Sequence, residues 1–137
     1  MPIISFGASV PTNGSQSLNR VIPNTPKAIR VAEFGLSVPR PQAKVHLHAT
    51  IGVTSLVVNP TILFQVFRNS QVIFSMRHQT TVAVGESESV SFHAVDLNPP
   101  TGYHAYYFTA KVENPTLGTN QASEVGPVTF TGLNYTE

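Results

Sequence analysis

Hydrophobic and polar residues alternate most regularly between Ala43 and Val53. A period of two is the spacing of a β-strand that buries one face, and it does not fit a helix. Two further apolar runs follow at residues 61–68 and 71–77, separated only by Asn69 and Ser70. Apolar, β-branched and aromatic runs joined by a two-residue turn predict a tight antiparallel hairpin.

Both faces of this predicted hairpin carry large apolar side chains. Ile62, Phe64 and Val66 fall on one face of its first strand, and Leu63 and Phe67 fall on the other. An antiparallel strand with one solvated face would alternate with polar residues. The pattern therefore predicts that the hairpin lies centrally in a sandwich or faces a partner chain.

The remaining strand signals are spaced by about 8 to 12 residues, as in β-sandwiches and barrels. They fall at residues 27–38, 80–84, 89–97, 103–112 and 123–135. No segment has a helical period of 3.6. We predict an all-β fold, a jelly-roll-like antiparallel β-sandwich of eight or nine strands, over residues 27–137.

The first 26 residues are rich in turn-forming residues and predict a flexible or docking N-terminal arm. The alternative is that the apolar run at residues 3–6 adds as a strand to the open edge of a neighbouring subunit.

Composition narrows the classes of partner. Only 11% of the 137 residues are charged and the formal net charge is +1, so repulsion between copies is weak and assembly is tolerated. The eight basic residues are dispersed, which disfavours nucleic acid. No apolar run is long enough for a membrane span, and we expect no secretory signal. With no cysteine, thiol catalysis and cysteine-ligated zinc are excluded.

Four segments carry a resemblance to a known family: residues 63–68, 72–74, 90–106 and 125–133. Together they resemble small bacillus spore-surface proteins of the exosporium protein C type. The closing pattern, Phe130 followed by Gly132, is also similar to the last strand of the tumour-necrosis-factor and complement-type jelly rolls, in which the C-terminal strand lies in the middle of a trimer.

The spore-family resemblance implies a non-enzymatic component of the spore surface. It implies synthesis in the mother-cell cytosol without a signal peptide, and it offers no catalytic residue. Expected partners are further copies of the chain, as a trimer, lattice or fibre, and other spore-surface proteins. No cofactor is expected.

His46 and His48 lie two apart, so both point from the polar face of one strand. Two imidazoles at this spacing could share a metal if a third ligand, for which His78, His93 and His104 are candidates, came from a neighbouring strand. We favour exposed histidines on a solvated face over a metal site.

The strand at residues 103–112 has aromatic residues on both faces. Tyr103 and Tyr107 share one face, whereas Tyr106 and Phe108 share the other. A core takes only one set, so the other set points outward, where aromatic rings suit subunit contacts or stacking on sugars. The alternation does not say which set is buried.

Three functions follow from these patterns. The first is a structural protein that self-associates through apolar outer strands, with Leu63, Phe67, Tyr106 and Phe108 as the expected interface. The second is a lectin-like module that binds glycans through Tyr103 and Tyr107. A hydrolase or metal enzyme ranks last, because no motif for nucleophilic, phosphate or zinc chemistry is present. A viral capsid jelly roll is also compatible with the fold.

Overall fold

The computed structural model describes residues 3–12, 14, 18–113 and 120–135, with the side chains of residues 3 and 4 left out. Its nine strands are β1 (Ile3–Thr12), β2 (Arg20–Ile22), β3 (Ile29–Val38), β4 (Lys44–Ser55), β5 (Thr61–Arg68), β6 (Gln71–Gln79), β7 (Ser87–Leu97), β8 (Gly102–Glu113) and β9 (Ala122–Tyr135). No residue in these described ranges is helical. The predicted all-β fold is confirmed.

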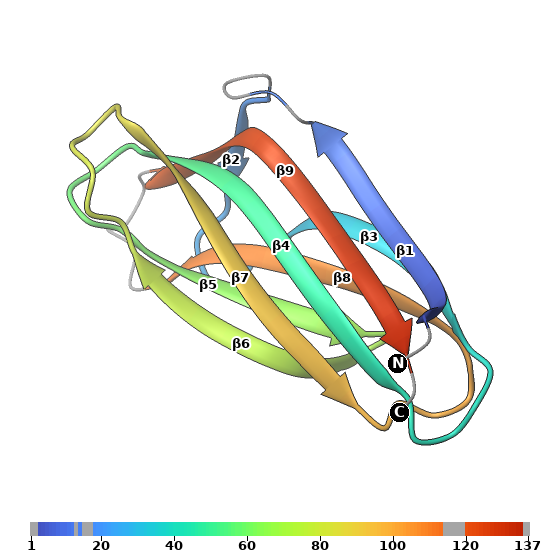
Figure 1. Ribbon diagram of the computed structural model, residues 1–137. Coiled ribbons are helices and arrows are strands. Elements are labelled where there is room, and N and C mark those ends of the chain that lie inside the picture. Colours follow the sequence, from blue (N-terminus) through green and yellow to red (C-terminus); the bar gives the residue numbers. More distant parts are fainter. Residues whose placement is uncertain (1–2, 13, 15–17, 114–119, 136–137) are drawn as a thin grey trace.

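The strands form two antiparallel sheets that face each other as a jelly-roll sandwich (Figure 1). Sheet A has the order β1-β9-β4-β7, with the short strand β2 also paired to β9. Sheet B has the order β3-β8-β5-β6. The C-terminal strand β9 is therefore an interior strand of sheet A, and β8 and β5 are interior in sheet B.

The hairpin predicted at residues 61–77 is present as β5 and β6. Arg68 pairs with Gln71 across the two-residue turn, and Asn69 adopts a left-handed φ of 56° that asparagine tolerates better than most residues. The predicted strand at 80–84 is absent. There Glu86 N donates to Ala83 O and Gly85 N to Ser55 O, so the segment turns back toward β4.

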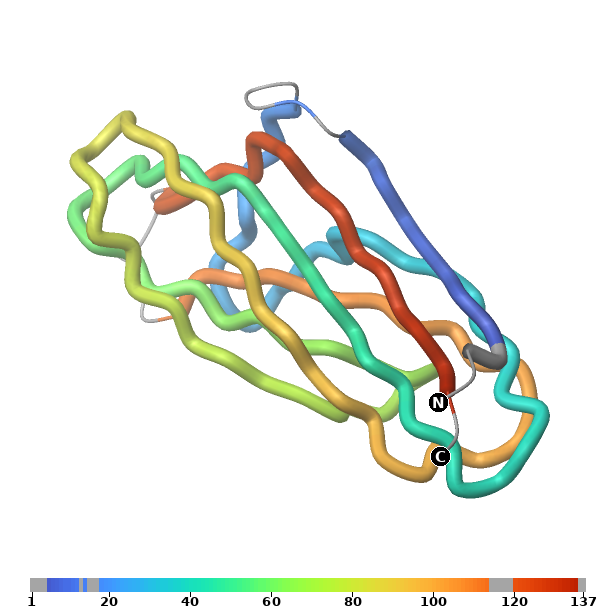
Figure 2. Tube along the Cα trace, in the orientation of Figure 1, coloured from blue at the N-terminus to red at the C-terminus, as the bar shows by residue number. Residues whose placement is uncertain are grey.

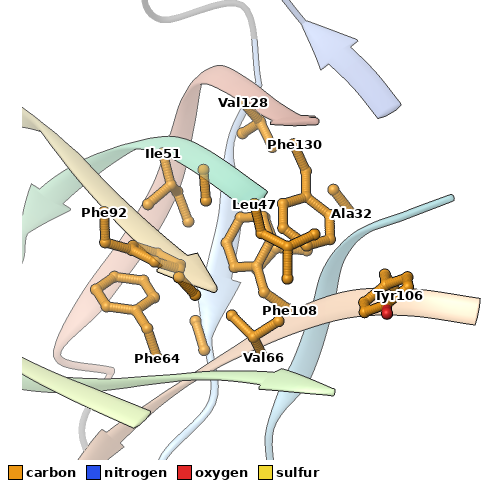
Figure 3. Close-up of a cluster of buried hydrophobic side chains, with 14 of the residues drawn as sticks. Ala32, Leu47, Ile51, Phe64, Val66, Phe92, Tyr106, Phe108, Val128 and Phe130 are labelled. Atoms are coloured by element: carbon orange, nitrogen blue, oxygen red, sulfur yellow. The ribbon is translucent and has the colours of Figure 1, made fainter. Parts of the chain in front are cut away.

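The core lies between the sheets and contains a cluster of packed aromatic rings among its aliphatic side chains (Figure 3). The ring of Phe108 in β8 meets Phe92 of β7 edge-on at 5.5 Å and Phe130 of β9 at 5.1 Å, centroid to centroid. Edge-to-face contacts of this kind stabilise beyond the burial of area. Phe108 thus ties sheet B to two strands of sheet A.

Tyr106 and Phe108 belong to this core, and their prediction as interface residues is wrong. Both side chains are 0% exposed within the single chain. Since side chains alternate along β8, burying these two turns Tyr103 and Tyr107 outward. The choice that alternation left open is settled by the packing of β8 against β7 and β9.

Much of the segment predicted as an arm is strand in the structure. Phe6 of β1 pairs with Leu133, and Val21 of β2 pairs with Ser123, so both strands hydrogen-bond to β9 of the same chain. Strands β1 and β3 lie side by side at this edge (Figure 2). Ser5 Oγ of β1 also donates to Ser37 O of β3, which links the two sheets there. Residues 3–12 thus lie on the chain's own sheet edge, because the backbone of β9 offers hydrogen-bond partners there.

The described ranges contain no helix that is long and apolar enough to cross a bilayer.

Candidate assembly face

The outward surface of sheet A, here called face A, is built by alternate residues of four strands. Cross-strand pairing aligns them in rows, because partners in register point to the same side of a sheet. One row runs from Phe6 through Leu133 and His46 to Val95, and the next runs through Ala8, Thr131, His48 and His93. A further row contains Tyr135, Lys44 and Leu97.

Large apolar side chains stand exposed on face A. Phe6 in β1 is 61% exposed and Leu97 in β7 is 64% exposed, with Val95 exposed as well and Leu133 partly so. These residues span the sheet from one edge strand to the other. Isolated exposed hydrophobic residues are ordinary on protein surfaces, but a set that shares one sheet face marks an interaction surface.

Three histidines cluster at the centre of this face. His93 of β7 pairs with His48 of β4, and their rings stack with centroids 4.3 Å apart. The His46 ring, also on β4, lies 5.3 Å from the His93 ring, centroid to centroid. The Tyr135 hydroxyl makes a hydrogen bond with His46 Nε2. The predicted outward position of His46 and His48 is confirmed, and β7 brings His93 to them.

The histidines do not converge as a metal site. Across the residues described by the structure, no group of three or more His, Cys, Asp or Glu side chains is arranged to hold a metal ion. The His48 and His93 rings are tilted by only 22°, a stacked arrangement, and His46 Nε2 is engaged by Tyr135. The geometry resembles a packed aromatic cluster.

Charge is scarce on face A. Among its described side chains, Lys44 is the one that is fully charged at neutral pH, and no acidic side chain points outward from β1, β4, β7 or β9. Hydroxyl pairs fill the rows beyond the histidines, such as Thr50 with Ser91 at 3.0 Å. Partial burial and the nearby His93, His48 and Lys44 lower the pKa of His46, so its neutral form is favoured.

The outward surface of sheet B, here called face B, is charged by contrast. Its acids are paired: Arg30 with Glu33, and Arg77 with Glu113. Leu63 points to this side but is only 6% exposed, because it stands in register between Arg77 and Lys111. The aliphatic stems of such long side chains cover apolar neighbours.

Phe67 also points to face B, where it packs against its own chain. Its ring stacks on Tyr107 at 4.8 Å with an interplanar angle of 7°. The Arg30 guanidinium lies 3.7 Å from the centroid of the Tyr107 ring. The apolar outer side of the hairpin, Leu63 and Phe67, is thus largely covered without a partner chain. That side is a poor candidate for the interface.

The two tyrosines predicted to bind glycans are placed differently. Tyr103 is 75% exposed, and its hydroxyl lies over Gly35 of β3, where an added Cβ would come within 1.7 Å. Tyr107 is stacked on Phe67 and contacted by Arg30. Four residues of strand separate them by about 13 Å. They do not form two walls of one sugar-sized site.

Three acidic side chains of sheet A point inward: Asp96, Glu124 and Glu88, of which Glu88 makes a hydrogen bond at 2.8 Å with His78 of sheet B. Asp96 of β7 accepts hydrogen bonds at 2.7 Å from Arg68 and from the Tyr106 hydroxyl, both in sheet B. Burial and the hydrogen bond to Asp96 raise the pKa of Tyr106, so the hydroxyl keeps its proton. This triad joins the sheets, and the proline-rich sequence after Asp96 gave no sign of it.

Glu124 of β9 is the second inward acid, and it is fully buried. Arg20 Nε from β2 lies 3.1 Å from its Oε1, yet neither carboxylate oxygen accepts a hydrogen bond of good geometry within the described chain. Burial raises the pKa of Glu124, and the positive charge of Arg20 partly opposes that rise.

Two shallow hollows on the surface are lined by residues that do not form a catalytic site. One, of about 280 Å³, is lined by apolar and hydroxyl side chains that include Leu18, Leu56 and Ser123. The other, of about 410 Å³, has Glu113 as its one acidic lining residue, and Arg77 already pairs with that carboxylate. Neither hollow brings a nucleophile next to a base.

The architecture defines the chain as a jelly-roll protein, and comparison with solved structures agrees. One similar structure is a chain of the T13 infectious bursal disease virus particle, at a TM-score of 0.58 and 6% identity, over 93% of this chain and 30% of that one. Another is the Eiger tumour necrosis factor of S. frugiperda, at a TM-score of 0.53 and 10% identity, over 100% and 95% of the two chains.

This chain thus spans less than a third of the viral chain and nearly all of the Eiger chain. At 6% and 10% identity the likeness is one of fold. It supports the predicted similarity to tumour-necrosis-factor jelly rolls. No protein-family model matches the sequence, and no curated protein is similar to it in sequence.

Proposed function

We propose that this protein is a non-enzymatic structural protein that assembles with further copies of itself through face A. The observation that carries the proposal is the character of that face. It combines exposed large apolar side chains, Phe6, Leu97 and Val95, with a single lysine and no outward acid among its described residues. A surface of this kind gains free energy when it is covered.

The face has the size that one stable contact needs. Four strands about 4.8 Å apart and about ten residues long, rising about 3.3 Å per residue, have a projected area of roughly 600 Å². Standard interfaces bury about 800 Å² on each partner. Protruding side chains such as Phe6 and Leu97 add to the projected area, so face A suffices for one specific interface.

A second copy is the occupant that the charges favour. Face A is nearly neutral, and the whole chain has a formal net charge of only +1, so two copies can approach without repulsion. A strongly charged partner would find few opposite charges to meet. The fold is compatible with assembly, since one structural neighbour comes from a viral particle.

The position of the C-terminal strand also supports the proposal. β9 is interior in sheet A and contributes Leu133, Thr131 and Tyr135 to face A. In the tumour-necrosis-factor type of jelly roll that the sequence resembles, the last strand lies in the middle of a trimer. We therefore place β9 at the centre of the contact, in a closed trimer or in a lattice or fibre.

A spore surface is the proposed location, and its support is the resemblance of residues 63–68, 72–74, 90–106 and 125–133 to exosporium protein C-like proteins. Immunogold labelling of intact spores tests this location separately from assembly. Label on the outer envelope is the expected result, and label confined to the mother-cell cytosol would contradict it.

Sedimentation velocity over a concentration series tests assembly directly. We expect species heavier than the 14.8 kDa monomer at micromolar concentration and neutral pH. A single monomeric species at high micromolar concentration would refute the proposal.

Glycan binding remains a second candidate, because Tyr103 is 75% exposed on face B. A glycan array that includes bacterial cell-wall sugars tests it, with Tyr103→Ala as the matched control. Binding that is lost in the variant would support this function, and an array without hits would remove it.

A further inference from the structure

The cluster of His46, His48 and His93 lies at the centre of face A, where an assembled partner would cover it. Building on the proposed function, we propose that pH controls the assembly of this protein: copies associate while these three histidines are neutral and separate when they gain protons. The inference concerns the regulation of face A and goes beyond its use as an interface.

The geometry places any new positive charges very close together. The His93 ring is close to both of the others, with ring centroids 4.3 Å from His48 and 5.3 Å from His46. Two imidazolium rings at such distances repel each other, and the repulsion grows when a partner excludes water from around them. Protonation of all three histidines is therefore unfavourable in the assembled state.

The surroundings offer no compensating negative charge. On β4 the charged neighbour is Lys44, whose positive charge adds to the repulsion. On β9 the titratable neighbour is Tyr135, whose hydroxyl makes a hydrogen bond with His46. On β7 and β1, the described side chains facing the cluster are Val95, Phe6 and Ala8, which do not titrate.

The other two histidines of the chain are placed in a different way. His78 of β6 makes a hydrogen bond at 2.8 Å with Glu88, and His104 of β8 is buried, with its Nε2 2.6 Å from Pro100 O. His78 thus has the carboxylate partner that the face A cluster lacks. It provides a natural control for the general effect of acid.

The isolated chain already favours neutral imidazole at one member of the cluster. The pKa of His46 is lowered by partial burial and by the nearby side chains of His93, His48 and Lys44. Covering the face would strengthen each of these causes. Histidine has its ordinary pKa near 6.5, so the transition falls between about pH 7.5 and pH 5.

The size of the effect follows from proton linkage. Each proton that must leave for two copies to associate changes the dissociation constant by up to about tenfold per pH unit below the free pKa. We expect the dissociation constant of the native chain to rise at least about tenfold from pH 7.5 to pH 5.5.

Sedimentation velocity at these two pH values is the test, applied to the native chain, the His48→Gln/His93→Gln double variant and the His78→Gln control. Near-ultraviolet circular dichroism confirms that each variant is folded at both pH values. The double variant should associate at both pH values with a clearly smaller pH response than the native chain, because only His46 of the cluster is left to gain a proton. The control should keep the full pH response of the native chain.

The outcomes separate this inference from the proposed function. Association of the native chain to the same extent at both pH values, or more strongly in acid, would overturn the pH control and leave assembly intact. A double variant with the native pH response would also overturn it. If the native chain is monomeric at both pH values, the assembly and its control fail together.

Discussion

The outer faces of the two sheets are built on the same core and differ in where their acids point. On face B, Glu33 and Glu113 point outward and pair with arginines. In sheet A, Asp96 and Glu124 point inward, and the outward residues are histidines, hydroxyls, apolar side chains and a single lysine. A sheet keeps its edge and face soluble with exposed charges, as face B does. Face A lacks that protection, which is expected of a surface that is covered in use.

The two outer faces can differ in this way only while the two sheets stay packed together, and Asp96 links the sheets at one end. Asp96→Ala should lower the free energy of unfolding by about 3–5 kcal/mol, since it leaves the mostly buried Arg68 without its carboxylate and Tyr106 without its acceptor. Urea unfolding measures the loss. Asp96→Asn, which keeps an acceptor for Tyr106, should lose less. A loss below about 1 kcal/mol for Asp96→Ala would contradict this role.

The next largest effect should come from introducing an arginine on face A, and an arginine introduced on face B serves as the comparison. Leu133→Arg puts a charge at the centre of face A, and Gln65→Arg puts one at the centre of face B. We expect the first to raise the dissociation constant of the assembly by about 100-fold or more, because the charge would be buried without a partner. The second should change it by less than about threefold. Equal effects of the two variants in sedimentation velocity would remove the distinction between the faces.

The buried Glu124 of sheet A predicts a pH dependence of stability. Because burial raises the pKa of Glu124 in the folded chain, the native state keeps a proton that the unfolded chain releases above its ordinary pKa of 4.5. The free energy of unfolding therefore falls as the pH rises from 4.5 toward the raised pKa, by at most about 1.4 kcal/mol per pH unit.

Glu124→Gln should remove this decline and match or exceed the native stability at neutral pH. Chemical unfolding at a series of pH values measures it. Glu33→Gln on face B is the control and should keep the native profile. A Glu124→Gln profile that still falls over the same range would show that another group is responsible.

The smallest effect is expected for the ion pairs of face B. A double-mutant cycle of Arg77→Ala and Glu113→Ala should give a coupling energy below about 1 kcal/mol, since Arg77 is largely exposed to water and salt. A coupling well above this value would mean that face B is stabilised by its charges as well as kept soluble by them.

Local patterns predicted the strands but not their neighbours. The alternation at residues 43–53 and the Asn69–Ser70 turn were sufficient for β4 and for the β5–β6 hairpin, because both depend on contacts close in the sequence. Of the two alternatives left open for the hairpin, an interior position or a partner chain, the structure shows β5 in the interior of sheet B and β6 at its edge. The assignment of 80–84 as a strand failed, since its short alternation competes with a turn held by Ser55 from β4.

Prediction of the histidine cluster would have required the order of the strands in sheet A, which no short-range sequence pattern contains. Residues 89–97 alternate so that His93 lies on the opposite face of its strand from the buried Phe92 and Ala94. That it lies beside His48 depends on the pairing of β7 with β4, 45 positions apart in the sequence for these two residues. Likewise, the apolar side of β5 pointed to an interface, but Arg77, Lys111 and Tyr107 from other strands cover it.

Accessibility of one introduced thiol on each face tests the central claim most directly, because the chain has no cysteine of its own. Thr131→Cys lies in the interior of face A, and Thr109→Cys lies in the interior of face B. The rate of maleimide labelling at pH 7.5 is measured at low and high protein concentration. The account predicts that labelling of Thr131→Cys slows as copies assemble while that of Thr109→Cys stays constant. Constant labelling of Thr131→Cys in a demonstrably assembled sample would contradict it.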